Sequence, residues 1–293
     1  MSSVIFNNRA HFAKRDANLV LVNTFTKYLG AFLCLLLMVS CEKEPVPEPA
    51  PTPAPKPAFA NHQVTVNGVT FTMIAVEHGC FIKGEKASSQ YYKTPVVLTK
   101  DFYLGACEVT QELWKAVMGD NMPSHFKGDS LPVDSLTYEQ CQTFLDKLNA
   151  LTGKRFRLPT QCEWEYAARG GALHEPYTYS GSDNIDEVGW YKANSGGTTH
   201  PVAQKKPNGL GLYDMTGNVF EWCADAFSIV SNPLYKNDTV YDPETYFDSD
   251  FCWVNRGGKY SSNKKEEITV SDVWGDFPNT AEKGYGLRLA LSR

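Results

Sequence analysis

The sequence lacks the short motifs that identify most common enzyme classes. It contains no His-Glu-x-x-His, no Gly-x-Ser-x-Gly, no phosphate-binding loop and no dinucleotide fingerprint. It has no internal repeat, and its few histidines are scattered along the chain. These absences exclude the usual zinc-protease, serine-hydrolase, P-loop and Rossmann interpretations, so any function must be argued from other features.

The chain also has no excess of positive charge. Its 28 Lys and Arg residues face 33 Asp and Glu residues, which gives a net charge of −5 at pH 7. Removal of residues 1–41 as a leader would leave 24 basic and 32 acidic residues, a net charge of −8. Nucleic acids are bound through clustered cations. The composition therefore indicates that nucleic acid is not a partner.

No cysteine pair has the Cys-x-x-Cys spacing of a zinc site. Six cysteines lie in the globular part, and an exported protein could join such an even set into disulfides. Free buried thiols are an equal alternative, and the spacing does not decide between them. The six are Cys80, Cys107, Cys141, Cys162, Cys223 and Cys252.

No uncharged run is long enough to cross a bilayer as a helix. Residues 28–40 carry no charge and follow four basic residues, which is the pattern of a signal peptide. The run ends in Ser40-Cys41, which resembles a bacterial lipobox and implies cleavage before Cys41 and lipid attachment to its thiol. A plain secretory signal or an uncleaved anchor is the alternative. We expect a lipid-anchored protein of the bacterial cell envelope, facing the periplasm or the cell surface.

Three regions follow from this pattern: a lipoprotein signal peptide (1–41), a linker (42–60) and a globular domain (61–293). Prolines alternate through the linker, and such a segment forms an extended spacer without a core. It would hold the domain away from the membrane surface.

The first half of the domain has clear local signals. Alternating apolar residues on both sides of Asn67-Gly68 predict a hairpin. Further strands are expected near 80–83 and 96–104. Helices are expected over 108–118, with Thr110 as cap, and from the capping boxes at Thr137 and Thr160. Beyond residue 171 regular periodicity stops.

Residues 208–225 combine three glycines with many apolar side chains. A loop of this kind must fold back into the protein, where its carbonyl groups need partners. Asp214 and Glu221 add two carboxylates to those carbonyls. Hard oxygen ligands gathered in one bend are typical of a calcium site.

The same stretch carries a resemblance. Gly-Leu-Tyr-Asp-Met-x-Gly-Asn-Val-x-Glu-Trp at 211–222 closely resembles the central signature of the formylglycine-generating, or sulfatase-modifying factor, family. Arg-Leu-Pro-Thr-x-x-Glu-Trp-Glu-Tyr-Ala-Ala-Arg-Gly-Gly at 157–171 and Arg-Gly-Gly at 256–258 are similar to the family in the same order. The resemblance implies an α+β, C-type-lectin-like fold with low regular secondary structure and long ordered loops.

The resemblance also implies a structural calcium ion. The family's motif places side-chain ligands at Asp214 and Glu221 and backbone ligands at Gly217 and Val219. The alternative is that Asn218 and Glu221 only satisfy backbone groups in a tight turn.

Catalysis in this family depends on two cysteines that bind copper(I). They would fall six residues after Arg256 and five residues later, where this chain has Ser262 and Glu267, and no cysteine follows Cys252. Oxygen ligands cannot replace a soft thiolate pair. Copper binding and formylglycine formation are therefore not expected.

Two classes of function remain. The first is a membrane-tethered ligand-binding or scaffold module whose partner is an unknown protein, peptide or glycan. The second is an enzyme of the wider family, an oxidoreductase acting on a protein or small molecule through an unidentified site. Aromatic residues near the altered segment suit ligand binding, although they could equally pack beneath the loop. The candidate ligand-binding residues are Tyr260, Ser262, Glu267, Trp274 and Tyr285.

Overall fold

A computed structural model describes residues 58–85, 93–227, 239–244, 252–263 and 268–293. All described residues belong to one compact unit within residues 52–293. Cys41, residues 42–57 of the expected linker and Glu267 lie outside the described residues. Within the described part, no helix is both long and apolar enough to cross a membrane.

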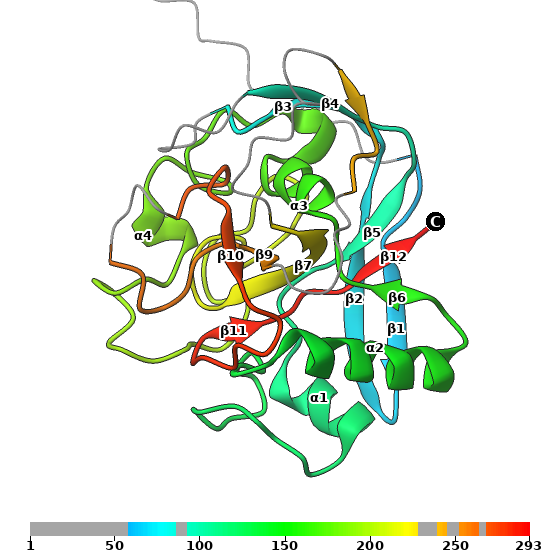
Figure 1. Cartoon of the computed structure of the whole chain (residues 1–293), viewed down its shortest axis with the longest axis vertical. Coiled ribbons are helices and arrows are strands. Elements are labelled where there is room, and N and C mark those ends of the chain that lie inside the picture. Colours follow the sequence, from blue (N-terminus) through cyan, green and yellow to red (C-terminus); the bar gives the residue numbers. More distant parts are fainter. Residues whose placement is uncertain (1–57, 86–92, 228–238, 245–251, 264–267) are drawn as a thin grey trace, which may run out of the picture. The chain divides into compact units, whose positions relative to one another are not determined.

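The described chain forms short helices and curled sheets joined by long ordered loops (Figure 1). The α+β prediction with little regular secondary structure is confirmed. In chain order the elements are β1 (His62–Val66), β2 (Val69–Val76), β3 (Gly79–Lys83), β4 (Thr94–Leu98), β5 (Phe102–Gly105), α1 (Gln111–Met118), α2 (Tyr138–Thr152), β6 (Phe156–Arg157), α3 (Gln161–Ala168), a 3-10 turn (Gly171–Leu173), α4 (Ile185–Val188), β7 (Phe220–Ala226), β8 (Val240–Tyr241), β9 (Trp253–Arg256), β10 (Trp274–Asp276), β11 (Tyr285–Gly286) and β12 (Ala290–Ser292).

Three sheets organise these strands. The five-stranded sheet has the order β1-β2-β5-β12-β6, so the closing strand β12 lies between two strands that come much earlier in the chain. The second sheet has the order β10-β9-β7-β11 and the third β3-β4-β8. In the second sheet β9 is antiparallel to β7, whereas β11 is parallel to it.

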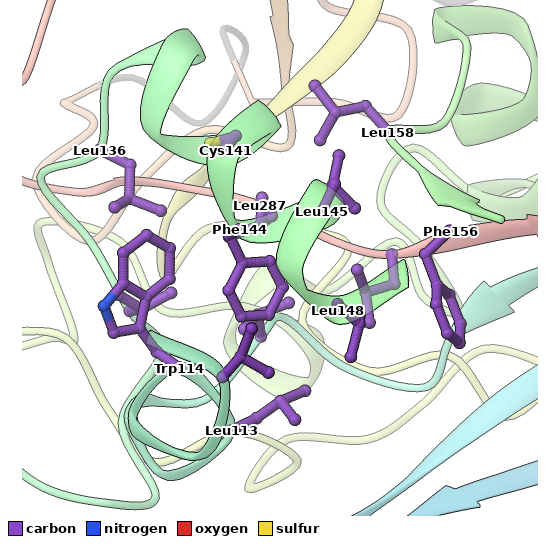
Figure 2. Close-up of a cluster of buried hydrophobic side chains, with 14 of the residues drawn as sticks. Leu113, Trp114, Leu136, Cys141, Phe144, Leu145, Leu148, Phe156, Leu158 and Leu287 are labelled. Atoms are coloured by element: carbon purple, nitrogen blue, oxygen red, sulfur yellow. The ribbon is translucent and has the colours of Figure 1, made fainter. Parts of the chain in front are cut away.

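Local sequence signals position the first half of the fold. Asn67 and Gly68 both take positive φ between β1 and β2, as the hairpin prediction requires. Helices α1, α2 and α3 begin directly after their predicted caps, and the two capping boxes at Thr137 and Thr160 are both formed, whereas the short helix α4 was not predicted. The apolar stripe of α2 is buried as predicted and faces α1, and Trp114 of α1 stacks on Phe144 at 5.1 Å between ring centroids (Figure 2).

Two local predictions differ from the structure. The strand expected over 96–104 is two strands, β4 and β5, which belong to different sheets. The stretch 208–225, expected as a folded-back loop, forms a turn that leads directly into β7, a strand buried on both faces. In β7 apolar residues at 220, 222, 224 and 226 alternate with Glu221, Cys223 and Asp225, so the period-two signal of a strand was present in this stretch.

Candidate functional site: a buried acidic turn and an aromatic sheet face

The turn at 214–219 is built from backbone that glycine and asparagine tolerate best. Asp214, Gly217 and Asn218 all have positive φ, at 57°, 77° and 59°. A Cβ at position 217 would lie 2.0 Å from the carbonyl oxygen of Trp190, so only glycine fits there. The turn is therefore pressed against the 190 loop with no room for a side chain.

Asn218 ties this turn to the neighbouring loops. Its amide Nδ2 donates to Glu108 at 2.7 Å, and its Oδ1 accepts from the backbone N–H of His200 at 2.9 Å. Its backbone N–H donates to Trp190, and its carbonyl accepts from Tyr260. All its polar groups are used within the fold, as the structural alternative for this residue expected.

Glu221 is held by an arginine. Its carboxylate oxygens accept from Arg288 Nη2 at 2.7 Å and from Arg288 Nε at 2.9 and 3.1 Å. Trp164 Nε1 donates to Oε2 at 2.6 Å. The side chains of Glu221 and Arg288 are fully buried. A carboxylate with two donors on each oxygen has little capacity left for a metal ion.

Asp214 has different surroundings. Its Oδ2 accepts from the backbone N–H of Ala203 at 2.7 Å, but its Oδ1 is buried with no hydrogen-bond partner. Burial raises the pKa of this carboxyl to about 6. An oxygen in this position needs a proton or a cation, so Asp214 fits a calcium ion.

Glu108 is a third carboxylate at this site, and the motif search did not find it. It is 1% exposed, and its Oε1 accepts from Val219 N–H at 3.1 Å. Burial first, then the nearby carboxylates of Asp214 and Glu221, raise its pKa. Three buried carboxylates thus share one guanidinium, that of Arg288. No group of three or more His, Cys, Asp or Glu side chains in the described residues is arranged to hold a metal.

The altered segment after Arg256 forms a closed turn. Ser262 Oγ accepts from the backbone N–H of Lys259 at 3.0 Å, and its carbonyl accepts from Lys192. Gly258 lies against Ile268, and a Cβ there would be 2.4 Å from that side chain. The hydroxyl of Ser262 therefore stabilises the turn in which it lies. Glu267 lies outside the described residues.

The six cysteines described are all free thiols, so the disulfide alternative does not apply to this structure. Burial raises the pKa of Cys107 and of Cys162 to about 12, and it also raises that of Cys252. A thiol with a raised pKa is a poor nucleophile at neutral pH.

Two of the predicted ligand-binding residues are interior residues. Tyr260 is 6% exposed and packs edge-on against Phe126, and Tyr285 is 5% exposed and donates its hydroxyl to Asp276 at 2.7 Å. In this structure neither ring is available to a ligand, because each is buried. Trp274 differs, since it is 40% exposed on β10.

Trp274 belongs to a larger aromatic surface, which sequence reasoning found only in part. The ring centroid of Trp274 lies 6.1 Å from that of Phe220 on β7. Tyr138 stacks on Trp253 with centroids 4.0 Å apart, and Phe277 is 59% exposed. The signal for Tyr138 and Trp253 was weak because 139 and 24 positions separate them from Phe277 in the chain.

Comparison with known proteins agrees with this architecture. The sequence model of the "Sulfatase-modifying factor enzyme 1-like domain" matches residues 58–293. The chain belongs to this family. Phe59 already packs against Tyr103 with centroids 5.1 Å apart, so domain contacts begin before the expected boundary at residue 61.

Two curated relatives illustrate the range of the family. The chain is similar to a protein named Chaperone protein LppX from Paenibacillus barcinonensis, with 37% identity over 215 residues that cover 56% of this chain and 75% of that protein. It is also similar to the formylglycine-generating enzyme of Streptomyces coelicolor, with 36% identity over 150 residues that cover 46% of each chain.

Solved structures give the same fold. Treponema denticola variable protein 1 matches with a TM-score of 0.72 and 29% identity, over 80% of this chain and all of that one. PvdO from Pseudomonas aeruginosa matches with a TM-score of 0.64 and 20% identity, over 82% of this chain and all of that one. Because its identity to PvdO is only 20%, this second match is evidence for the fold alone.

Proposed function

We propose that this chain is a membrane-tethered ligand-binding or scaffold member of the family, without formylglycine-generating activity. The observation that carries the proposal is Ser262, whose hydroxyl lies in a closed turn at the position where the resemblance implies a copper-binding cysteine. A hydroxyl is a hard ligand and does not select copper(I). No cysteine follows Cys252 in the sequence to take over the role.

The ligand is a protein, peptide or glycan. The relative named as a chaperone supports a protein or peptide, because its similarity extends over three quarters of its length. The mature chain is acidic, which argues against nucleic acid.

The test of the first proposal is an activity assay. The purified chain is incubated with copper(I), oxygen and a sulfatase-motif peptide, and aldehyde is captured with a hydrazide reagent. The formylglycine-generating enzyme of Streptomyces coelicolor is the positive control. We expect no aldehyde from this chain, and its appearance would overturn the proposal.

The second candidate is an enzyme of the wider family, an oxidoreductase acting through an unidentified site. Its support is the similarity to proteins named formylglycine-generating enzymes. Oxygen consumption above that of a protein-free mixture separates it from a binding module, because copper(I) alone also reduces oxygen.

We further propose that the 214–219 turn binds a structural calcium ion. Asp214 and Glu221 would supply side-chain oxygens, and Gly217 and Val219 backbone oxygens. The unpartnered Oδ1 of Asp214 and the surplus of negative charge around Arg288 support it. Glu221 would have to release part of its contact with Arg288. A calcium ion here would balance the negative charge of the buried loops and so stabilise the fold. The test is therefore thermal melting with and without EGTA.

Membrane attachment is proposed through lipid on Cys41. The small residue before the cysteine and the uncharged run before that are its support. We expect labelled palmitate to enter the wild-type chain in bacterial cells and not Cys41→Ser. Equal labelling of the wild type and the variant would contradict lipid attachment to Cys41 and leave a plain secretory signal or an uncleaved anchor as the explanation.

A further inference from the structure

Three unpartnered oxygens lie on the 214–219 turn. The Oδ1 atom of Asp214 has no hydrogen-bond partner, and this residue is 2% exposed. No described residue donates to the carbonyl of Gly217 or of Val219, although both residues are buried. Buried oxygens are normally paired, so three of them on one turn indicate a place for a cation.

Glu108 holds the turn on which these oxygens lie. Its Oε1 accepts from the backbone N–H of Val219 at 3.1 Å, and its Oε2 accepts from Nδ2 of Asn218 at 2.7 Å. The Asn218 carbonyl accepts from Tyr260 N–H at 2.7 Å. The peptide group between the carbonyls of Gly217 and Val219 is therefore fixed from both sides, and Glu108 provides one of the two contacts.

The position of Glu108 is set by a distant part of the chain. This residue lies between β5 and α1, 111 positions before Val219. The backbone on either side of it is anchored, because Ala106 N–H donates to Thr72 at 2.9 Å and Val109 N–H donates to Leu287 at 3.0 Å. The carboxylate is therefore brought to the turn by the packing of the sheet and cannot leave without moving the start of α1.

The charges around the turn do not balance. After burial, the charges that act on the pKa of the Cys107 thiol are those of Arg288, Asp214, Glu108 and Glu221, so these four groups lie around one thiol. Three carboxylates and one guanidinium leave a surplus of two negative charges when all are ionised. Because buried charges are normally paired, a divalent cation would complete the balance. Without Glu108 the surplus would be a single charge.

A carboxylate that only clamps loops has a different setting, which Asp134 illustrates. Asp134 is fully buried and accepts from the backbone N–H groups of His125 at 3.2 Å and Gly284 at 2.8 Å. It is not among the main charges that act on Asp214 or Glu108. Glu108 resembles it in its hydrogen bonds and differs in its place beside the unpartnered oxygens.

We propose that Glu108 is the positioning residue of the calcium site, because it holds the turn that carries the ligand oxygens and supplies the third negative charge that suits the site to a divalent ion. The inference rests on the proposed calcium site and adds to it a residue outside the ligand set that the family resemblance implies. Glu108 acts through Asn218 and Val219, and no direct bond to the ion is required.

The test is isothermal titration of calcium into the purified chain after EGTA treatment and desalting. We expect Glu108→Gln to raise the Kd for calcium about 10–100-fold, since loss of a group that orients metal ligands typically has an effect of this size. Glutamine keeps the length of the side chain but not its charge. Asp134→Asn is the matched control, because it removes an equally buried carboxylate from a different loop, and it should leave the Kd unchanged.

Thermal melting separates positioning from simple stabilisation. An ion that binds only the folded protein raises its melting temperature by an amount that depends on the Kd. Calcium should therefore raise the melting temperature of the wild type and of Asp134→Asn by similar amounts, and that of Glu108→Gln by less. A merely structural role would lower the melting temperature of Glu108→Gln and leave its response to calcium unchanged.

Glu108→Asp covers the case in which Glu108→Gln does not fold. Aspartate keeps the charge but is one methylene shorter, so it holds the two donors less well and should raise the Kd, by less than glutamine does. A Kd for Glu108→Asp equal to that of the wild type would overturn the proposal if glutamine gives no folded protein.

The remaining outcomes distinguish the two proposals. If the wild type neither binds calcium in the titration nor responds to EGTA in melting, the calcium site itself fails. If the wild type binds calcium and Glu108→Gln binds it equally tightly, the site stands and the role assigned to Glu108 is wrong. An equal loss of affinity in Asp134→Asn would also overturn that role, because the effect would then follow from removal of any buried carboxylate.

Discussion

Replacement of Glu221 by glutamine removes the negative charge of a fully buried ion pair. In the structure the Glu221 carboxylate accepts three contacts from Arg288 and one from Trp164. Removal of one partner from such a pair typically costs about 3–5 kcal/mol, because the other charge stays buried without its partner. Glutamine keeps the shape and one acceptor, and Glu108 remains near Arg288. We therefore expect the lower end, about 3 kcal/mol.

The assay is urea unfolding followed by tryptophan fluorescence, together with thermal melting. For a domain of this size about 3 kcal/mol corresponds to a fall of about 6–12 °C in the melting temperature. The control is Glu187→Gln, whose pair with Lys206 is 4.0 Å long and about half exposed. It should change the free energy of unfolding by less than about 1 kcal/mol.

EGTA separates the two roles of Glu221. If calcium binds this carboxylate, EGTA lowers the melting temperature of the wild type and leaves Glu221→Gln unaffected. If only the ion pair is present, the variant is destabilised equally with and without EGTA. A loss below about 1 kcal/mol in EGTA would refute the argument from the buried pair.

Three further predictions concern the same core. Burial raises the pKa of Asp214 from 3.8 to about 6. The cost of ionising this carboxyl in the folded protein is therefore absent below pH 3.8, grows as the pH rises to 6 and is complete above pH 6. In EGTA the stability of Asp214→Asn relative to wild type should rise between pH 4 and 7 by up to about 3 kcal/mol, and a flat difference in urea unfolding would contradict this. Glu165→Gln leaves the buried guanidinium groups of Arg169 and Arg256 without their carboxylate. It should cost about 3–5 kcal/mol in urea unfolding with no response to EGTA, and a loss that depends on calcium would contradict it. Gly217→Ala should fail to give folded protein on expression because of the 2.0 Å contact, whereas Gly196→Ala, with open space at its Cβ, should cost only about 1 kcal/mol; similar melting of both variants would refute the steric reasoning.

Prediction from the sequence succeeded where the determining contacts are local. The capping box at Thr137 involves Gln140, three positions away, and the stripe of α2 follows from a single period. The hairpin at Asn67-Gly68 likewise depends on neighbours in the chain. Such features can be predicted without knowing the rest of the fold.

Prediction was weaker where pairs are distant in sequence. Calcium binding by Glu221 stays a prediction, but the contact of this carboxylate with Arg288, 67 positions later, was not predicted. Glu108 reaches Val219 across 111 positions. No local pattern reports such pairs, so neither Glu108 nor Arg288 was found as a member of the site.

The sequence by itself determined the family, the starts of α1, α2 and α3, the first hairpin and the serine at position 262, because each depends on residue identity or on near neighbours. The tertiary structure decided which aromatic rings are exposed and which carboxylates are neutralised. Burial and charge pairing are properties of segments brought together by folding. Tyr285 and Trp274 are both aromatic and 11 positions apart in the sequence, yet only the packing around β7 makes one interior and the other a surface residue.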